Sequence, residues 1–192
     1  MFGEEGVILI TSGEQMSQQI SYTLYQKQKI TKPIIEDVIN ELLDNDRRKA
    51  ALDFIGFLRS YKMTPQWASL NAWSVKYKGK PVCSIKFYDL RLYMDKGTWR
   101  ICHSGDYDSG YECLLSEENI KNIVWNNVYI CRNCAGTLTP HSVHVPIFGK
   151  EFDNVCLYFK IQFENPDAET LICAKKLVEM RRKVISENIN HT

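Results

Sequence analysis

The sequence lacks a long apolar run, and this absence excludes a class of protein. None of its 192 residues belongs to a stretch near the ~20 consecutive apolar residues that a membrane-spanning helix needs. The apolar run from Val7 to Ile10 is too short for a signal peptide and has no basic segment before it. We therefore expect no membrane partner.

An excess of one charge sign is also missing. Lysine and arginine number 24 against 23 aspartates and glutamates, so the net charge is +1. A nucleic-acid-binding protein usually carries a strong basic excess, and this balance argues against a nucleic acid as partner. Two short basic runs, at residues 47–49 and 181–183, fall inside predicted helices, where such charges usually form a solvated face.

Disulfide bonds are not expected, although cysteine is common. The chain has seven cysteines, an odd number, and it is long enough to bury a core without disulfides or metal. A reducing, cytoplasmic location is the simplest interpretation. Most of the thiols would then be small buried hydrophobic groups or metal ligands.

Residues 31–192 show the periodicities of a single α+β domain. Helical spacing predicts a hairpin of two helices, from Pro33 to Leu43 and from a cap at Asp46 to Tyr61. Alternation with a period of two then predicts a run of strands, over residues 72–77, 82–88, 90–94 and 98–103.

The C-terminal half continues this pattern. A short helix follows Ser116, and one unbroken strand is expected from Val155 to Phe163, with one fully apolar face. Asn165-Pro166-Asp167 is a typical start for the last helix. We predict an antiparallel sheet with the helical hairpin and the C-terminal helix packed on one face.

Residues 1–30 form an N-terminal extension without convincing periodicity. Gly13-Glu14-Gln15 could be encoded by a sequence that resembles a ribosome-binding site directly before Met16. We therefore hypothesise that Met16 is the biological start and that residues 1–15 are not native.

One cluster of residues has the chemistry of a metal site. Cys131 and Cys134 are spaced to hold one edge of a tetrahedral zinc ion, and His141 and His144 are near enough to complete it. Cys156 on a neighbouring strand could replace either histidine. A redox pair at the two closest thiols, or no special role, are the alternatives, and a gap of six residues is shorter than in the usual zinc finger.

A second cluster is aromatic. Strand aromatics that face away from the helices can line a pocket for an apolar or cationic ligand; the candidates are Trp67, Trp73, Trp99 and Tyr93, with Glu112 as the acidic residue. The alternative is packing in the core, where most tryptophans lie. An enzyme is less favoured, because Cys102 and His103 are adjacent and point to opposite faces of a strand, and no nucleotide-binding or hydrolase motif occurs.

The chain also resembles a bacterial family. The residues concerned are Pro65-x-Trp67, the stretch from Ala72 to Lys80, the Cys131-x2-Cys134 pair and Asn165-Pro166-Asp167. Over roughly residues 46–186 this pattern is similar to YdhG-like and GyrI-like α+β domains. The resemblance implies an aromatic-rich groove that binds small amphipathic molecules.

Together these observations predict a non-enzymatic domain that binds a small molecule or acts as a sensor. The alternative is a structural zinc module that mediates protein–protein interaction, and an enzyme of unknown type comes third. A homo-oligomer is compatible with the sequence.

Overall fold

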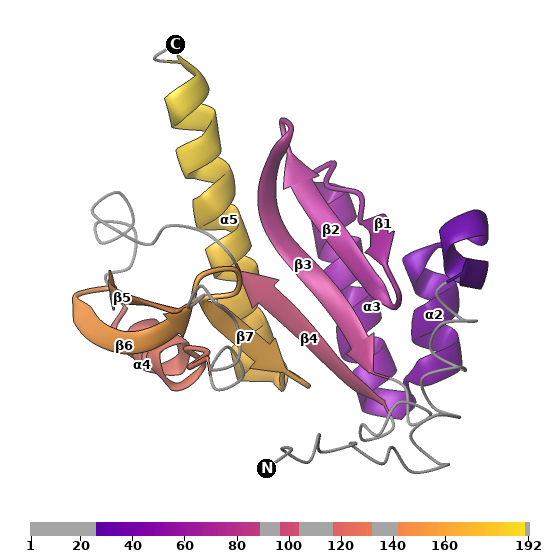
Figure 1. The fold of residues 1–192 in the computed structure, drawn as a ribbon, viewed down its shortest axis with the longest axis horizontal. Helices are drawn as coiled ribbons and strands as arrows, with labels where there is room; N and C mark the ends of the chain where they lie inside the picture. The colour runs from indigo at the N-terminus through magenta and orange to yellow at the C-terminus, as the bar shows by residue number, and fades with distance from the viewer. Residues whose placement is uncertain (1–25, 89–96, 104–116, 132–141, 191–192) are drawn as a thin grey trace, which may run out of the picture.

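The computed structural model describes residues 26–88, 97–103, 117–131 and 142–190 (Figure 1). Several predicted features lie outside these described residues: Met16 and the segment before it, the strand at 90–94, Tyr93, Glu112, Cys134 and His141.

A five-stranded antiparallel sheet with the order β1-β2-β3-β4-β7 forms the centre of the fold. The strands are β1 (Gln66–Ser69), β2 (Ala72–Tyr77), β3 (Lys80–Tyr88), β4 (Thr98–His103) and β7 (Ile161–Glu164). Lys78 and Gly79 connect β2 to β3 with positive φ angles of 47° and 78°, as a two-residue hairpin turn requires. The predicted meander is confirmed for β2, β3 and β4, and β1 is an additional edge strand.

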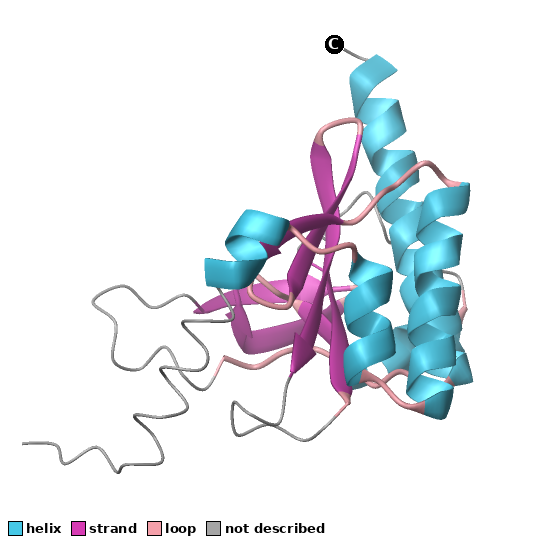
Figure 2. Cartoon of the chain, turned by 90° about the vertical axis from the view of Figure 1, so that its right-hand side faces the viewer, coloured by secondary structure: helices cyan, strands magenta, loops and turns pink. Residues whose placement is uncertain are grey.

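The helices α2 (Ile35–Leu42), α3 (Asn45–Ser60) and α5 (Ala168–Asn190) form a layer on one side of this sheet (Figure 2). A shorter helix, α4 (Glu118–Asn126), contacts α5. The predicted fold class, α+β with an N-terminal helical hairpin and a C-terminal helix, is confirmed. Within the described residues, no helix combines the length and apolar character needed to cross a membrane.

The core lies between the sheet and this helical layer. One row of the sheet runs through Trp73, Ile85, Ile101 and Phe163 on four adjacent strands, and each of these side chains is at most 1% exposed. Phe54 of α3 packs against this face. Burial of each such side chain stabilises the fold by roughly 1.5–3 kcal/mol, so the alternating pattern fixes which sheet face meets the helices.

A second, two-stranded sheet consists of β5 (Ser142–Ile147) and β6 (Lys150–Cys156). The prediction of one strand from Val155 to Phe163 is wrong, since β6 ends at Cys156 and β7 begins at Ile161. Tyr129 explains the break: its N–H donates to the Lys160 carbonyl at 2.9 Å, and its carbonyl accepts from the Cys156 N–H at 3.0 Å. Residues 157–159 leave the ladder, and Leu157 is 47% exposed.

The predicted cap of the second helix is also wrong. Asp44 occupies the cap position of α3 in an extended conformation, and Asp46 lies in the first helical turn. At the short break between α2 and α3, the Arg48 guanidinium donates two hydrogen bonds to the Leu43 carbonyl, at 3.0 and 2.7 Å. These bonds satisfy a carbonyl group at the end of α2.

Candidate functional site

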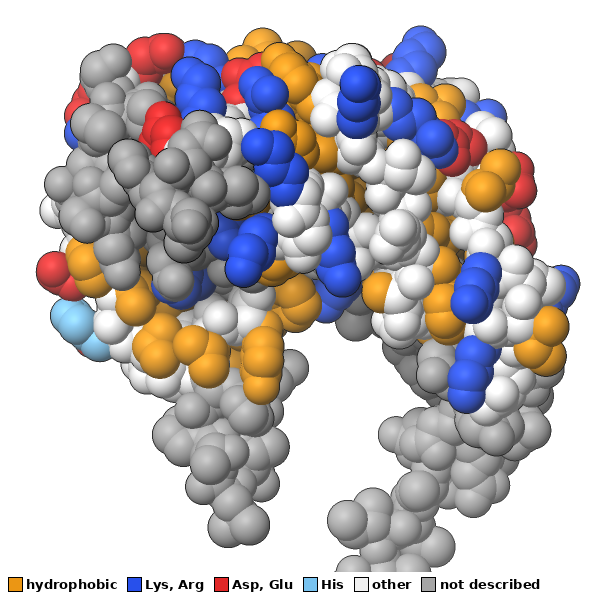
Figure 3. Space-filling view, turned by 90° about the horizontal axis from the view of Figure 1, so that it is seen from above, with side chains coloured by type: hydrophobic (Ala, Val, Ile, Leu, Met, Phe, Trp, Pro, Cys, Tyr) orange, Lys and Arg blue, Asp and Glu red, His pale blue; other side chains and the backbone are white. Residues whose placement is uncertain are grey.

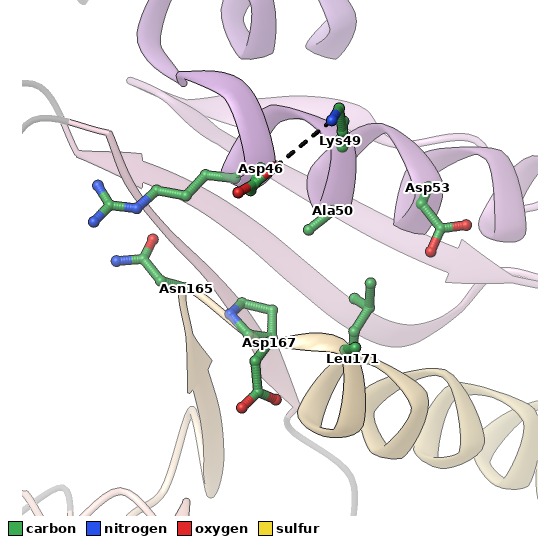
Figure 4. A pocket seen from close by; sticks show the side chains of 10 residues that line it. Asp46, Lys49, Ala50, Asp53, Asn165, Asp167 and Leu171 are labelled. Carbon is green, nitrogen blue, oxygen red and sulfur yellow. Dashed lines mark ion pairs between the residues drawn. The ribbon is translucent and has the colours of Figure 1, made fainter.

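A cleft of about 550 Å³ lies between the first turns of α3 and the segment that leads from β7 into α5 (Figure 4). Its volume falls within the ~300–1,000 Å³ that small-molecule sites usually have. The lining residues are Asp46, Arg47, Lys49, Ala50, Asp53, Asn165, Pro166, Asp167, Ala168 and Leu171.

The floor of the cleft is apolar. Ala50 and Leu171 point toward one another from α3 and α5 (Figure 4), and Pro166 is buried beside them. These residues belong to the same helix faces that build the core. The cleft is therefore a place where the two helices diverge and leave part of their apolar faces uncovered.

The start of α5 is held firmly against the central sheet. The Asn165 N–H donates to the Trp99 carbonyl at 2.9 Å, and the Trp99 N–H donates to the Asn165 side-chain oxygen at 3.0 Å. Asp167 then caps the helix by accepting from the Thr170 N–H at 2.9 Å, and this hydrogen bond holds the pKa of Asp167 below its usual value. The cleft wall is thus held by reciprocal hydrogen bonds between Asn165 and Trp99.

Among the lining residues carboxylates outnumber cations, and Lys175 from outside this set pairs with Asp53 at 2.7 Å. Three aspartates face two basic residues, and Arg47 is engaged by the Gly97 carbonyl at 3.2 Å. Lys49 lies 3.7 Å from Asp46 in an exposed pair, which contributes little binding energy. An apolar floor below a negative rim fits a small molecule with one apolar end and one cationic end.

Two of the predicted ligand-binding tryptophans are core residues. Trp73 is 1% exposed and its indole N–H donates to the Pro33 carbonyl at 3.3 Å, while Trp99 is fully buried. Phe87 packs between them, edge-on to Trp73 and stacked with Trp99 at centroid distances of 5.6 and 6.5 Å. These two indoles do not line an open pocket, because the helical layer encloses them. The backbone of Trp99 instead forms hydrogen bonds with Asn165, which lines the cleft.

Trp67 lies on β1 opposite Trp73 and is half-buried. Its indole N–H donates to the Gln28 side chain at 3.3 Å, and Gln28 also accepts from the Asn71 N–H at 2.9 Å. This contact ties the helical turn at residues 26–31 to the edge of the sheet, and it is remote from the cleft.

Two of the predicted zinc ligands are neighbours. Cys131 donates its N–H to the Asn154 carbonyl at 2.8 Å, and the Ile130–Val155 bridge between the same segments is antiparallel. The Cys156 N–H donates to the Tyr129 carbonyl at 3.0 Å, so the two cysteines belong to two segments that pair with each other. Within the described ranges no three potential ligands come together in a metal-binding arrangement.

His144 is engaged by carboxylates. Its Nδ1 atom lies 2.7 Å from Asp153 and its Nε2 atom 3.1 Å from Glu151, on the exposed side of the β5–β6 hairpin. The hydrogen bond with Asp153 raises the pKa of His144. Both ring nitrogens thus already have partners other than a metal ion.

A cysteine–histidine pair that sequence reasoning missed lies inside the sheet. His103 of β4 is directly opposite Cys83 of β3, and both are buried. Burial raises the pKa of Cys83 far above its usual value and lowers that of His103 to about 3. Both groups are therefore neutral, and an activated nucleophile needs a thiolate. The sequence could have revealed this pair only if the register of β3 against β4 had been known, because that register places Cys83 opposite His103.

Comparisons with family models, with curated proteins and with solved structures found no match to this chain. The resemblance to the YdhG-like and GyrI-like domains therefore stays a prediction.

Proposed function

We propose that the protein is a non-enzymatic domain that binds a small amphipathic cation in the cleft between α3 and α5. The observation that supports this most directly is the combination of an apolar floor, at Ala50 and Leu171, with three aspartates at the rim. The volume of about 550 Å³ accommodates one ligand of modest size.

The charges of the lining residues favour a cation over an anion. Asp53 already binds Lys175 at 2.7 Å, which shows that an ammonium group can approach this carboxylate. Asp46 is 96% exposed in its side chain, so its carboxylate can turn toward a ligand. An organic anion would meet these carboxylates on entry and would be repelled.

The experiment compares phenethylamine, 2-phenylethanol and phenylacetate, which share one ring but carry a positive, no and a negative charge. Binding to the full chain is followed by two-dimensional NMR. The expected result is saturable shifts at Ala168, Ala50 and Leu171, strongest with the amine. Equal responses to all three probes, or no saturable response in the cleft, would refute the proposal.

A matched pair of variants tests the location. Ala168 is exposed and lines the cleft, so Ala168→Trp should fill the cleft and weaken amine binding at least tenfold. Ile172 lies on the same helix, is 54% exposed and does not line the cleft. Ile172→Trp should therefore leave binding unchanged, and equal losses in both variants would contradict the assignment.

The structural zinc module is the second candidate, and the pairing of the segments that carry Cys131 and Cys156 supports it. Two thiolates favour zinc over magnesium or calcium; Cys134 and His141 are the further ligands that the sequence offers. In this alternative the metal stabilises residues 131–156, and the surface around it binds a partner protein.

Elemental analysis of untagged protein tests this second candidate. About one zinc per chain is expected in the wild type and much less in Cys156→Ser. Cys173 is a matched control, because this buried thiol of α5 contacts Ile120 far from the predicted ligands in sequence. Metal far below one per chain in the wild type, or equal loss in Cys173→Ser, would exclude the site.

A further inference from the structure

Basic side chains gather at one end of the molecule, although the whole chain is nearly neutral. They come from the end of α3, from the β2–β3 hairpin and from the C-terminal half of α5. We call this group the basic pole; its members are Lys62, Lys76, Lys78, Lys80, Arg181, Arg182 and Lys183. Figure 3 views this end of the molecule and shows many more lysines and arginines than acids among the described residues.

Specific contacts join the three segments of the basic pole. The Arg182 guanidinium lies 4.3 Å from the ring centroid of Tyr61 and 6.0 Å from that of Tyr77. Arg181 donates to the Pro81 carbonyl, which follows the hairpin turn, at 3.3 Å. These contacts join the C-terminal half of α5 to the end of α3 and to the β2–β3 hairpin, so the cations of the three segments share one surface.

Little negative charge opposes these cations locally. Glu179 and Glu187 are the acids nearest to these cations along α5: Glu179 accepts a hydrogen bond from the Tyr61 hydroxyl at 2.8 Å, and Glu187 is exposed about one turn beyond Lys183. Lys62, Lys76, Lys80 and Lys183 are exposed and form no ion pair in the described part of the chain. The like charges repel one another, and a polyanion would relieve this repulsion.

The surroundings of the basic pole favour a nucleic acid over a membrane. A membrane-binding surface usually combines basic residues with apolar side chains that enter the lipid. The large exposed hydrophobic residues of the described chain lie elsewhere: Ile30, Ile34, Ile130, Leu157, Tyr158 and Ile172.

The aromatic rings at the basic pole also indicate the form of the nucleic acid. Single-strand binders stack unpaired bases on exposed aromatic rings. Here Arg182 covers Tyr61 and Tyr77, and both rings are half-buried. What remains exposed is a set of lysines on a projecting hairpin and a helix, which suits contact with phosphates.

We propose that the basic pole binds the phosphate backbone of a nucleic-acid duplex without reading its base sequence. This proposal is independent of the cleft. The shared chemistry is the phosphodiester backbone, and DNA and RNA duplexes are its two sources.

The test is fluorescence anisotropy of the full chain with 20-base-pair DNA and RNA duplexes, a single strand and anionic phospholipid vesicles. Micromolar affinity for a duplex in 50 mM salt is expected, weakening steeply at 200 mM. Comparison of the affinities for the DNA and the RNA duplex shows which of the two nucleic acids the surface prefers. No duplex binding at 100 μM protein, or stronger binding to the single strand or the vesicles, would overturn the proposal.

Charge reversal locates the surface. Lys78→Glu with Lys80→Glu should weaken duplex binding at least tenfold and lower the slope of log K against log salt by about 2, because two phosphate contacts are lost. The control is Lys27→Glu with Lys29→Glu, which changes the net charge equally. Lys27 and Lys29 flank Gln28, which contacts Asn71 at the other end of β2, about 20 Å from the hairpin turn.

The control double variant should retain wild-type affinity to within about threefold. Lys183→Glu on α5 should weaken binding as well, although by less than the hairpin pair. If the control variant loses as much affinity as the hairpin variant, the binding is a general charge effect and the assigned surface is wrong. All variants change exposed residues, and their folding is checked by thermal unfolding.

Discussion

His103 should make the stability of this protein sensitive to mild acid. The side chain is fully buried in β4 and its ring meets Phe163 edge-on at 5.8 Å. Neither ring nitrogen has a hydrogen-bond partner among the described residues. Burial lowers the pKa of His103 to about 3, against about 6.5 in an unfolded chain. Cys83, which lies opposite, is also neutral and offers no compensating charge.

The sign of the effect follows from proton binding. Between pH 6.5 and about pH 3 the unfolded chain binds a proton that the folded chain does not bind. The contribution of neutral His103 is therefore fully present above pH 6.5 and is lost as the pH falls. Unfolding becomes easier by about 2 kcal/mol at pH 5, and by roughly 5 kcal/mol below pH 3.

Urea unfolding at pH 7.5 and pH 5 measures this loss. His103→Phe removes the titrating group and keeps an apolar ring. Between pH 7.5 and pH 5, the free energy of unfolding of the wild type should therefore drop by about 2 kcal/mol more than that of His103→Phe. His144→Gln is the control. His144 is exposed and its pKa is raised, so its contribution is present below pH 6.5 and is lost as the pH rises, which is the opposite direction. Parallel losses in the wild type and His103→Phe would refute the reasoning, and so would an imidazole of His103 that titrates near pH 6.5 in the folded protein.

Three further predictions concern packing and local electrostatics. Trp99→Ala should lower the free energy of unfolding by about 3–5 kcal/mol, whereas Trp67→Ala, at a half-buried edge position, should cost clearly less; equal losses in urea unfolding would contradict the assignment of Trp99 to the core. The Glu179 carboxylate raises the pKa of Tyr61, so Glu179→Gln should lower the midpoint of one tyrosine in an ultraviolet titration, and an unchanged curve would count against that contact. Gly97 has a φ of 74°, and an added Cβ would lie 3.2 Å from the Arg47 guanidinium, so Gly97→Ala should reduce stability by about 1 kcal/mol or more, and an equal or higher melting temperature would show that the strain is absent.

Local patterns predicted the elements whose neighbours are close in sequence. The helical hairpin, the β2–β3 turn at Lys78-Gly79 and the helix after Asn165-Pro166-Asp167 all depend on residues a few positions apart. Failures came where distant segments compete for backbone hydrogen bonds. The stretch from Val155 to Phe163 alternates throughout. However, the backbone of Tyr129 forms hydrogen bonds with Cys156 and Lys160, and the residues between them lie outside the sheet.

The candidate site was less predictable than the fold. The sequence left open whether the tryptophans line a pocket or pack in the core, and only the tertiary structure shows that Trp73 and Trp99 are buried. The cleft itself forms from the starts of two helices about 120 residues apart in the chain. Local patterns place Asp46 and Asn165-Pro166-Asp167 near helix starts, and no sequence signal indicates that the two segments line one cleft.

The sequence by itself determined the α+β class and the positions of most turns, because these depend on periodicity and on local backbone preferences. Tertiary packing decided which sheet face meets the helices, since Trp73 and Trp99, expected on the other face, are buried in the core with Phe54 of α3. Only the tertiary structure decided which distant residues share a surface. The neutral overall charge argued against a nucleic-acid partner. Folding nevertheless brings Arg181 into contact with Pro81, which is 100 residues earlier in the chain and directly follows Lys80. Net charge sums over the whole chain, whereas a ligand meets only the charges that the fold places within its reach.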